Sequence, residues 1–63
     1  MGKRDNHSEI EVNLLDADSS LSDAIHFATV GKLSHELIEE ILTTLKHNNR
    51  ALRILASIQG EAS

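Results

Sequence analysis

The second half of the chain places apolar residues at alternating steps of three and four, the heptad pattern of a helix that packs along one face. Asn48 is the single polar residue at these positions. We expect the six residues to form an interface, and we predict that it joins two copies of the chain. The alternative is that they fill a core between two helices of one chain. The set is Ile38, Ile41, Leu45, Asn48, Leu52 and Leu55.

Two adjacent asparagines, Asn48 and Asn49, decide whether residues 34–59 form one helix or two. Asn has a low helix propensity and is common in turns, so the pair could separate two shorter helices. The charges favour a single helix, because acidic residues stand near its start and basic residues toward its end, which suits the helix dipole. We predict one continuous helix, about 37 Å long at 1.5 Å per residue, which Gly60 ends.

A shorter helix is predicted before it, from about residue 21 to residue 30. Ser20 and Asp23 have the spacing of a capping box at its start, after a turn over residues 16–20. Gly31 ends this helix, and Ser34 caps the next one. The two helices would then form a helical hairpin.

Residues 9–14 alternate between polar and apolar side chains, which is the period of a half-buried strand. Ile10 and Val12 favour a strand, but six residues cannot form a sheet alone. We expect a short extended or β segment that pairs with the same segment of another chain or packs as an arm. The predicted fold is therefore all-α, with two to three helices after this segment, in a dimer.

The length of 63 residues allows one small domain, which we place at residues 9–60, between a flexible polar arm at 1–8 and a tail at 61–63. A chain of this size buries only about 60% of the surface that its unfolded form exposes, so its core is marginal. The absence of Cys excludes disulfides and thiolate metal sites. A second subunit is the expected source of stability, and we predict a homo-oligomer, most simply a dimer.

Two segments come close to metal-binding motifs. Residues 35–39, His-Glu-Leu-Ile-Glu, resemble the helical zinc-protease motif with Glu in place of its second His. Residues 16–20 mimic the start of a calcium loop, but Leu21 and Phe27 replace its required Gly and its closing Glu. We interpret the first as a solvated helix turn and the second as a turn with a helix cap. With no Cys nucleophile and no Gly-rich phosphate loop, the sequence predicts no enzyme, no metal and no cofactor.

The order of segment, helix, Gly turn and helix resembles the ribbon-helix-helix family of dimeric DNA-binding repressors. The likeness covers about residues 9–46. It rests on the alternation over residues 9–14, the spacing of Leu21, Ile25 and Ala28, and the run from Gly31 to Ile38. The resemblance implies paired strands from two chains that enter the major groove.

Carried over by position, the resemblance gives Asn13 the role of reading a base edge, while Lys3 and Arg4 contact phosphates. Glu9 and Glu11 would lie on the same reading face and would repel phosphate, and the formal net charge is −4. A DNA-binding transcriptional regulator is therefore the alternative function.

In size, composition and general look, the chain also resembles the small accessory proteins encoded in the early region of lambdoid phages. The leading hypothesis is a non-enzymatic regulatory protein that acts through helical self-association and a protein-binding surface, with a host or regulatory protein as a further partner. No signal peptide and no apolar run of roughly 18 residues is present, so we expect a cytoplasmic protein without a membrane partner. A membrane-surface helix ranks last, because the polar faces are rich in acidic residues.

Overall fold

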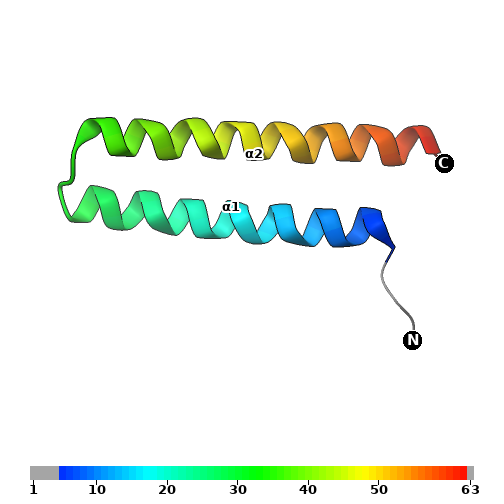
Figure 1. The fold of residues 1–63 in the computed structure, drawn as a ribbon, viewed down its shortest axis with the longest axis horizontal. Helices are drawn as coiled ribbons and strands as arrows, with labels where there is room; N and C mark the ends of the chain where they lie inside the picture. Colours follow the sequence, from blue (N-terminus) through cyan, green and yellow to red (C-terminus); the bar gives the residue numbers. More distant parts are fainter. Residues whose placement is uncertain (1–4, 63) are drawn as a thin grey trace.

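A computed structural model gives the structure of residues 5–62, with side-chain surroundings described up to residue 58. Two helices, α1 (Asn6–Val30) and α2 (His35–Ala62), run antiparallel and side by side, joined by a short turn (Figure 1). The Cα atoms extend over 45 × 25 × 11 Å. The chain is thus one flat layer of two helices, and the predicted all-α helical hairpin is confirmed.

The start of α1 is capped by Asp5. Its Oδ1 accepts a hydrogen bond from the Ser8 backbone N–H at 2.8 Å, and its carbonyl oxygen accepts one from the Glu9 N–H at 3.1 Å. The hydrogen bonds from Ser8 hold the pKa of the Asp5 carboxyl below its ordinary value of 3.8. Residues 6–8 of the predicted arm therefore lie in α1, and residues 1–4 lie outside the described residues.

Residues 9–20 continue the same helix, so the prediction of an extended or β segment over 9–14 and of a turn over 16–20 is wrong. No strand is found between residues 5 and 62. The alternating run is too short to make a sheet alone, whereas α2 offers it a long apolar face to cover as a helix. Leu14 is half-buried toward α2 while Val12 lies outside, as helical rather than strand periodicity requires.

The turn ends α1 with a Schellman motif. The Lys32 N–H donates to the Thr29 carbonyl at 3.1 Å, and the Leu33 N–H donates to the Ala28 carbonyl at 3.0 Å. Lys32 takes the left-handed conformation, with φ of 54°, whereas Gly31 has φ of −77°. A Cβ on Gly31 would lie 3.1 Å from the Phe27 carbonyl oxygen. Gly31 thus ends α1 as predicted, but it is favoured by the lack of space and not by a positive φ.

Ser34 caps α2 as predicted, because its Oγ accepts a hydrogen bond from the Leu37 N–H at 3.2 Å. The helix passes through Asn48 and Asn49 without a break, which confirms one continuous helix. It runs to Ala62, so Gly60 lies inside it and does not end it.

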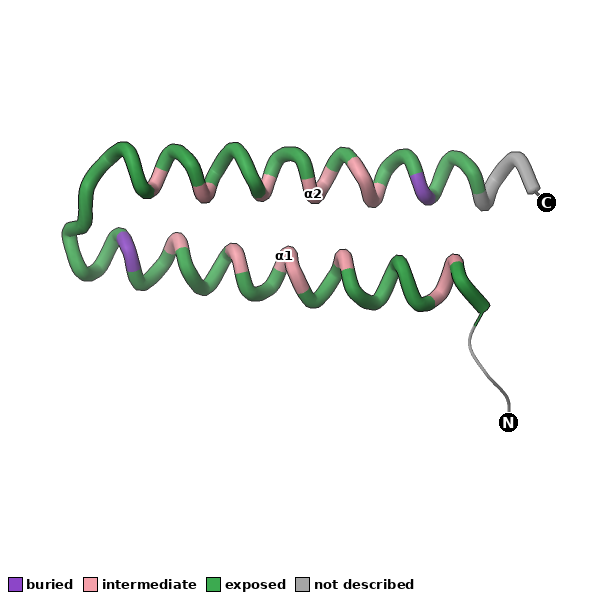
Figure 2. The backbone as a smooth tube through the Cα atoms, viewed as in Figure 1, coloured by how far each residue is buried: buried purple, intermediate pink, exposed green. Residues whose placement is uncertain are grey.

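The core between the helices is thin. Among the described side chains, Ala28 and Leu55 alone are buried, at 3% and 7% exposure. A half-buried set from both helices accompanies them, and these positions face one another across the layer (Figure 2). The set is His7, Ser8, Leu14, Ala17, Asp18, Leu21 and Ile25 on α1, with Ile38, Ile41, Leu45, Asn48, Asn49, Ala51 and Leu52 on α2.

Candidate interaction surface

The six predicted interface residues all lie on the face of α2 that is turned toward α1. Leu55 is buried there and the other five are half-buried (Figure 2). With 25 residues instead of the predicted ten or so, α1 is long enough to cover Leu52 and Leu55 as well. We call these residues and their α1 counterparts the seam. The seam is made within one chain, and its contact with a second chain stays a prediction.

Asn48 ties the two helices together at the middle of the seam. Its Nδ2 donates a hydrogen bond to the backbone carbonyl oxygen of Leu14 at 2.8 Å, in a part-buried position. A carbonyl oxygen has two lone pairs, so Leu14 can accept this bond besides its own helical one. The polar residue within the heptad pattern is therefore satisfied by the main chain of α1 and fixes the register of the hairpin.

The α1 side of the seam has a heptad pattern of its own, which the sequence analysis missed. His7, Leu14, Leu21 and Ala28 are seven residues apart, and Glu11, Asp18 and Ile25 occupy the alternate positions. Two carboxylates in this pattern interrupt the apolar stripe and conceal the helix. The spacing of Leu14, Leu21, Ile25 and Ala28 was the signal that could have revealed it.

Most large apolar side chains of the hairpin remain exposed, between 36% and 69% of their surface. Contiguous exposed apolar patches larger than a few hundred Å² are rare on monomeric soluble proteins and often mark interaction sites. The sequence analysis did not identify these exposed residues as a group. They are Ile10, Val12, Leu15, Phe27, Val30, Leu33, Leu37, Leu42, Ile54 and Ile58.

The flanking positions on one flat side of the hairpin are apolar except for Thr44; we call this side the open face. On each helix it is formed by residues that directly precede alternate positions of the heptad seam. Because the two helices are antiparallel, these residues lie on the same side of the hairpin. The hydroxyl of Thr44 donates a hydrogen bond to the Glu40 carbonyl oxygen at 2.9 Å, so its polar group is satisfied within α2. The open face consists of Ile10, Ala17, Ala24, Leu37, Thr44, Ala51 and Ile58.

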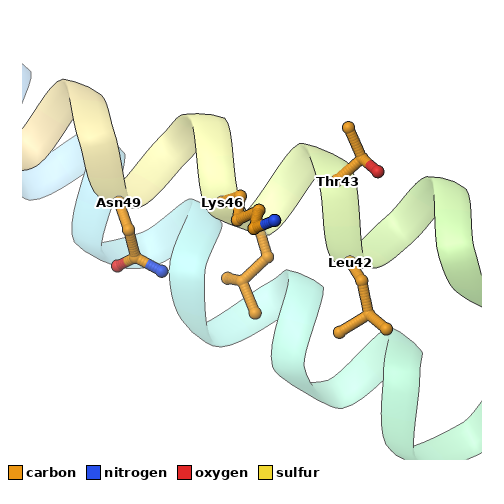
Figure 3. Close-up of a pocket in the computed structure, with 5 residues that line it drawn as sticks. Leu42, Thr43, Lys46 and Asn49 are labelled. Carbon is orange, nitrogen blue, oxygen red and sulfur yellow. The ribbon is translucent and has the colours of Figure 1, made fainter.

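The opposite flat side is mixed. Its eight flanking positions carry five polar side chains and three apolar ones. A shallow hollow of about 310 Å³ lies on this side, and all the residues that line it belong to α2. Figure 3 shows these residues as sticks. A hollow lined by a single helix cannot enclose most of a small molecule, as ligand pockets do. The flanking positions are Ser8, Leu15, Ser22, Thr29, His35, Leu42, Asn49 and Ala56, and the hollow is lined by Leu42, Thr43, Leu45, Lys46 and Asn49.

The charges are divided between the helices. α1 carries five acidic residues and no Lys or Arg, whereas residues 41–60 of α2 carry Lys46, Arg50 and Arg53 and no acidic residue. These three, with Thr43 and His47, line a second shallow hollow of about 370 Å³ along the outer side of α2. The two long edges of the layer therefore differ in sign, acidic along α1 and basic along the middle of α2.

Two further points of the sequence analysis concern metal-binding motifs and DNA-contact residues. The described residues contain no group of three or more His, Asp or Glu side chains that could hold a metal ion. Of the DNA-contact residues, Lys3 and Arg4 lie outside the described residues. Asn13 lies in α1, where its Nδ2 donates to the Glu9 carbonyl at 2.8 Å.

Within the described residues, neither helix contains a segment long and apolar enough to cross a bilayer. No protein-family model matches the chain, and no similar protein is found among the curated proteins or the solved structures. The resemblances to ribbon-helix-helix repressors and to phage accessory proteins therefore stay predictions.

Proposed function

We propose that this protein is a non-enzymatic regulatory protein that acts by self-association and by binding another protein through its exposed apolar side chains. The observation that carries the proposal is the imbalance of burial. Two described residues are buried, whereas ten large apolar residues are exposed. Domains are built from at least two packed layers around a core, and this hairpin supplies one.

The accessible surface supports the same proposal. The chain exposes 5001 Å², whereas a compact monomer of 6.9 kDa is expected to expose about 4000 Å². The difference is close to the roughly 800 Å² that each partner buries in a standard interface. A partner that covers one side of the layer would bring the exposed area near the compact value.

The test is the mass of the purified protein in solution, measured by sedimentation equilibrium from 1 to 200 µM with helicity recorded in parallel. We expect twice the chain mass of 6.9 kDa, at unchanged helicity. A helical protein that keeps the single-chain mass over the whole range would contradict self-association.

A further inference from the structure

We propose that the middle of α2 binds an acidic, amphipathic segment of a partner protein, along a surface where an apolar hollow adjoins a basic one. The inference rests on the protein-binding part of the proposed function, and it names the surface and the chemistry of the partner. We call this surface the α2 groove. It is lined by Leu42, Thr43, Leu45, Lys46, His47, Asn49, Arg50 and Arg53.

The two hollows of the α2 groove adjoin because Thr43 and Lys46 line both. The hollow of about 310 Å³ extends to the seam residue Leu45 and contains Leu42, whose side chain is 46% exposed (Figure 3). The hollow of about 370 Å³ lies farther round the helix and contains the three cations of the middle of α2. Together they follow α2 from residue 42 to residue 53, over about 17 Å at 1.5 Å per residue.

The cations of the α2 groove have no anionic partner within the part of the chain that the structure describes. Lys46, Arg50 and Arg53 are exposed, and none forms an ion pair with a described residue. No Asp or Glu stands three or four positions from any of them, whereas Arg50 follows Lys46 by four residues and precedes Arg53 by three. Like charges at these spacings destabilise a helix. Carboxylates bound in the groove would neutralise this stripe of positive charge.

The apolar part of the groove favours a protein segment over other polyanions. Leu42 offers a contact for an aliphatic side chain, which a nucleic-acid backbone lacks. The positive stripe is also short, because Glu36, Glu39 and Glu40 precede it on exposed positions of α2 and would repel a long phosphate backbone or an anionic membrane. A helix that carries apolar residues at steps of three and four, with carboxylates beside them, matches both parts of the groove.

A second copy of the chain is the other source of an acidic helix, since α1 carries five acidic residues and no Lys or Arg. Its outer edge would then bind the outer edge of α2 in the next copy. Such a contact joins two different surfaces, so it leaves one of each free and grows into open chains of molecules. An acidic segment of a different protein completes the contact in one step, and it is the occupant that we propose.

Selection from a display library of random peptides, about 16 residues long so that a helix spans the groove, tests the chemistry of the ligand on the immobilised full chain. We expect the enriched peptides to be rich in Asp and Glu and to place Leu or Ile at steps of three and four. A fluorescent copy of an enriched peptide then gives the dissociation constant by anisotropy. We expect high salt to weaken its binding about tenfold, because the carboxylates and the cations meet at the protein surface.

Two pairs of matched variants test the two parts of the groove. Arg50→Glu and Lys32→Glu each reverse one exposed positive charge, in the groove and in the turn respectively. We expect Arg50→Glu to weaken peptide binding about tenfold or more and Lys32→Glu less than about threefold. Leu42→Ala and Leu15→Ala each shorten one exposed leucine on the same flat side of the hairpin, and only Leu42→Ala should weaken binding.

Thermal circular dichroism separates a loss of binding from a loss of folding. Arg50→Glu places a carboxylate four residues after Lys46 and three residues before Arg53, so it replaces two repulsions with two attractions. We expect this variant to melt at or above the temperature of the parent while it fails to bind the peptide. A lower melting temperature would contradict the charge argument.

The possible outcomes separate the inference from the proposed function. Acidic peptides whose binding Arg50→Glu weakens selectively, at unchanged oligomeric mass, confirm the α2 groove. Enrichment of no acidic peptide, or equal weakening by Lys32→Glu, overturns the inference and leaves the self-association measured by sedimentation intact.

The other occupants give results of their own. A changed oligomeric mass of Arg50→Glu assigns the surface to a second copy, and tighter binding of phosphatidylserine vesicles or duplex DNA than of the peptide assigns it to phosphates. Either result overturns the inference. A chain that stays monomeric at all concentrations but binds acidic peptides in the groove confirms the inference and overturns the proposed self-association.

Discussion

At the scale of single residues, two side chains decide the geometry of the hairpin. Asn48 was recognised in the sequence as the polar member of an apolar set, and in the structure it lies inside a continuous helix, facing α1 of the same chain, and not in a turn. Its partner could not be read from the sequence, because a main-chain carbonyl 34 residues away carries no residue-specific signal. The left-handed backbone conformation of Lys32 could not be predicted either, because glycine adopts this conformation more readily than lysine and Gly31 is the adjacent residue.

We predict that Asn48→Leu raises the melting temperature. The change removes one hydrogen bond, worth about 1 kcal/mol net, from a carbonyl that keeps its helical bond, and it adds about 1.5–3 kcal/mol of apolar burial when burial is complete. Because the site is only half-buried, we expect a net gain of about 1 kcal/mol, seen in thermal circular dichroism. The near-isosteric Asn48→Asp should instead destabilise, because it replaces the amide donor with an acceptor that faces the Leu14 carbonyl. Equal melting temperatures for all three would show that the hydrogen bond has no part in stability.

We predict that Lys32→Gly stabilises the hairpin by about 1 kcal/mol, because the left-handed conformation costs a non-glycine residue roughly 1–2 kcal/mol and glycine very little. Urea unfolding followed by circular dichroism measures the difference. Lys32→Ala is the matched control, since it removes the same charge and keeps the Cβ, and it should give no comparable gain. A larger gain from the alanine than from the glycine would assign the effect to the charge.

At the scale of the elements, α2, the turn and the last ten residues of α1 were predicted, whereas the first part of α1 was not. Ser34 and Gly31 are local signals, and each appears in the structure in its predicted role of helix cap or helix end. The apolar heptads are a local signal for the helix itself, and the structure places them against α1 of the same chain. In α1, by contrast, the run from Ile10 to Leu14 fits a strand as well as a helix over six residues, and only the face offered by α2 decides between them. Glu11 and Asp18 in the α1 seam add to the ambiguity, because they make the helix look polar all round.

We predict that Asn13→Pro destabilises the protein by about 3 kcal/mol, because proline in a helix interior removes a backbone hydrogen bond and clashes with the preceding turn. Asn13 is exposed, so no core packing is lost with its side chain. Asn13→Ala is the control and should be neutral or slightly stabilising, since alanine has the higher helix propensity. Far-UV circular dichroism and thermal unfolding report both effects. An extended arm at residues 9–14 would tolerate the proline with little loss of helicity.

At the scale of the whole molecule, the surfaces of the hairpin depend on how the two helices are placed side by side. The open face became visible only when α1 was placed beside α2, because it combines Ile10, Ala17 and Ala24 from one helix with Leu37 and Ala51 from the other. The two groups of residues are too far apart in the sequence for a local pattern to show that they share a surface. The sequence therefore indicated that a partner surface was needed, through the length of the chain and its marginal core, but did not locate it.

We predict no measurable binding to duplex DNA at physiological salt, because the net charge is −4 and the five acidic residues of α1 repel phosphate. Fluorescence anisotropy with random-sequence and selected duplexes provides the measurement. The double variant Lys3→Ala, Arg4→Ala should behave like the parent. If the parent bound one duplex at nanomolar strength and the double variant weakened binding to all sequences alike, DNA recognition would be the correct function.

The burial of so few residues has a consequence for how the protein persists in a cell. Two described residues are buried. If the proposed self-association supplies the missing stability, the folding free energy depends on the concentration of the protein itself. At low synthesis rates the chain would spend more of its time open and accessible to proteases, and degradation would keep its level low. At high synthesis rates, paired molecules would escape degradation and accumulate. The amount of protein would then rise more than linearly with its rate of synthesis. The protein would accumulate, and act, only above a threshold rate of synthesis.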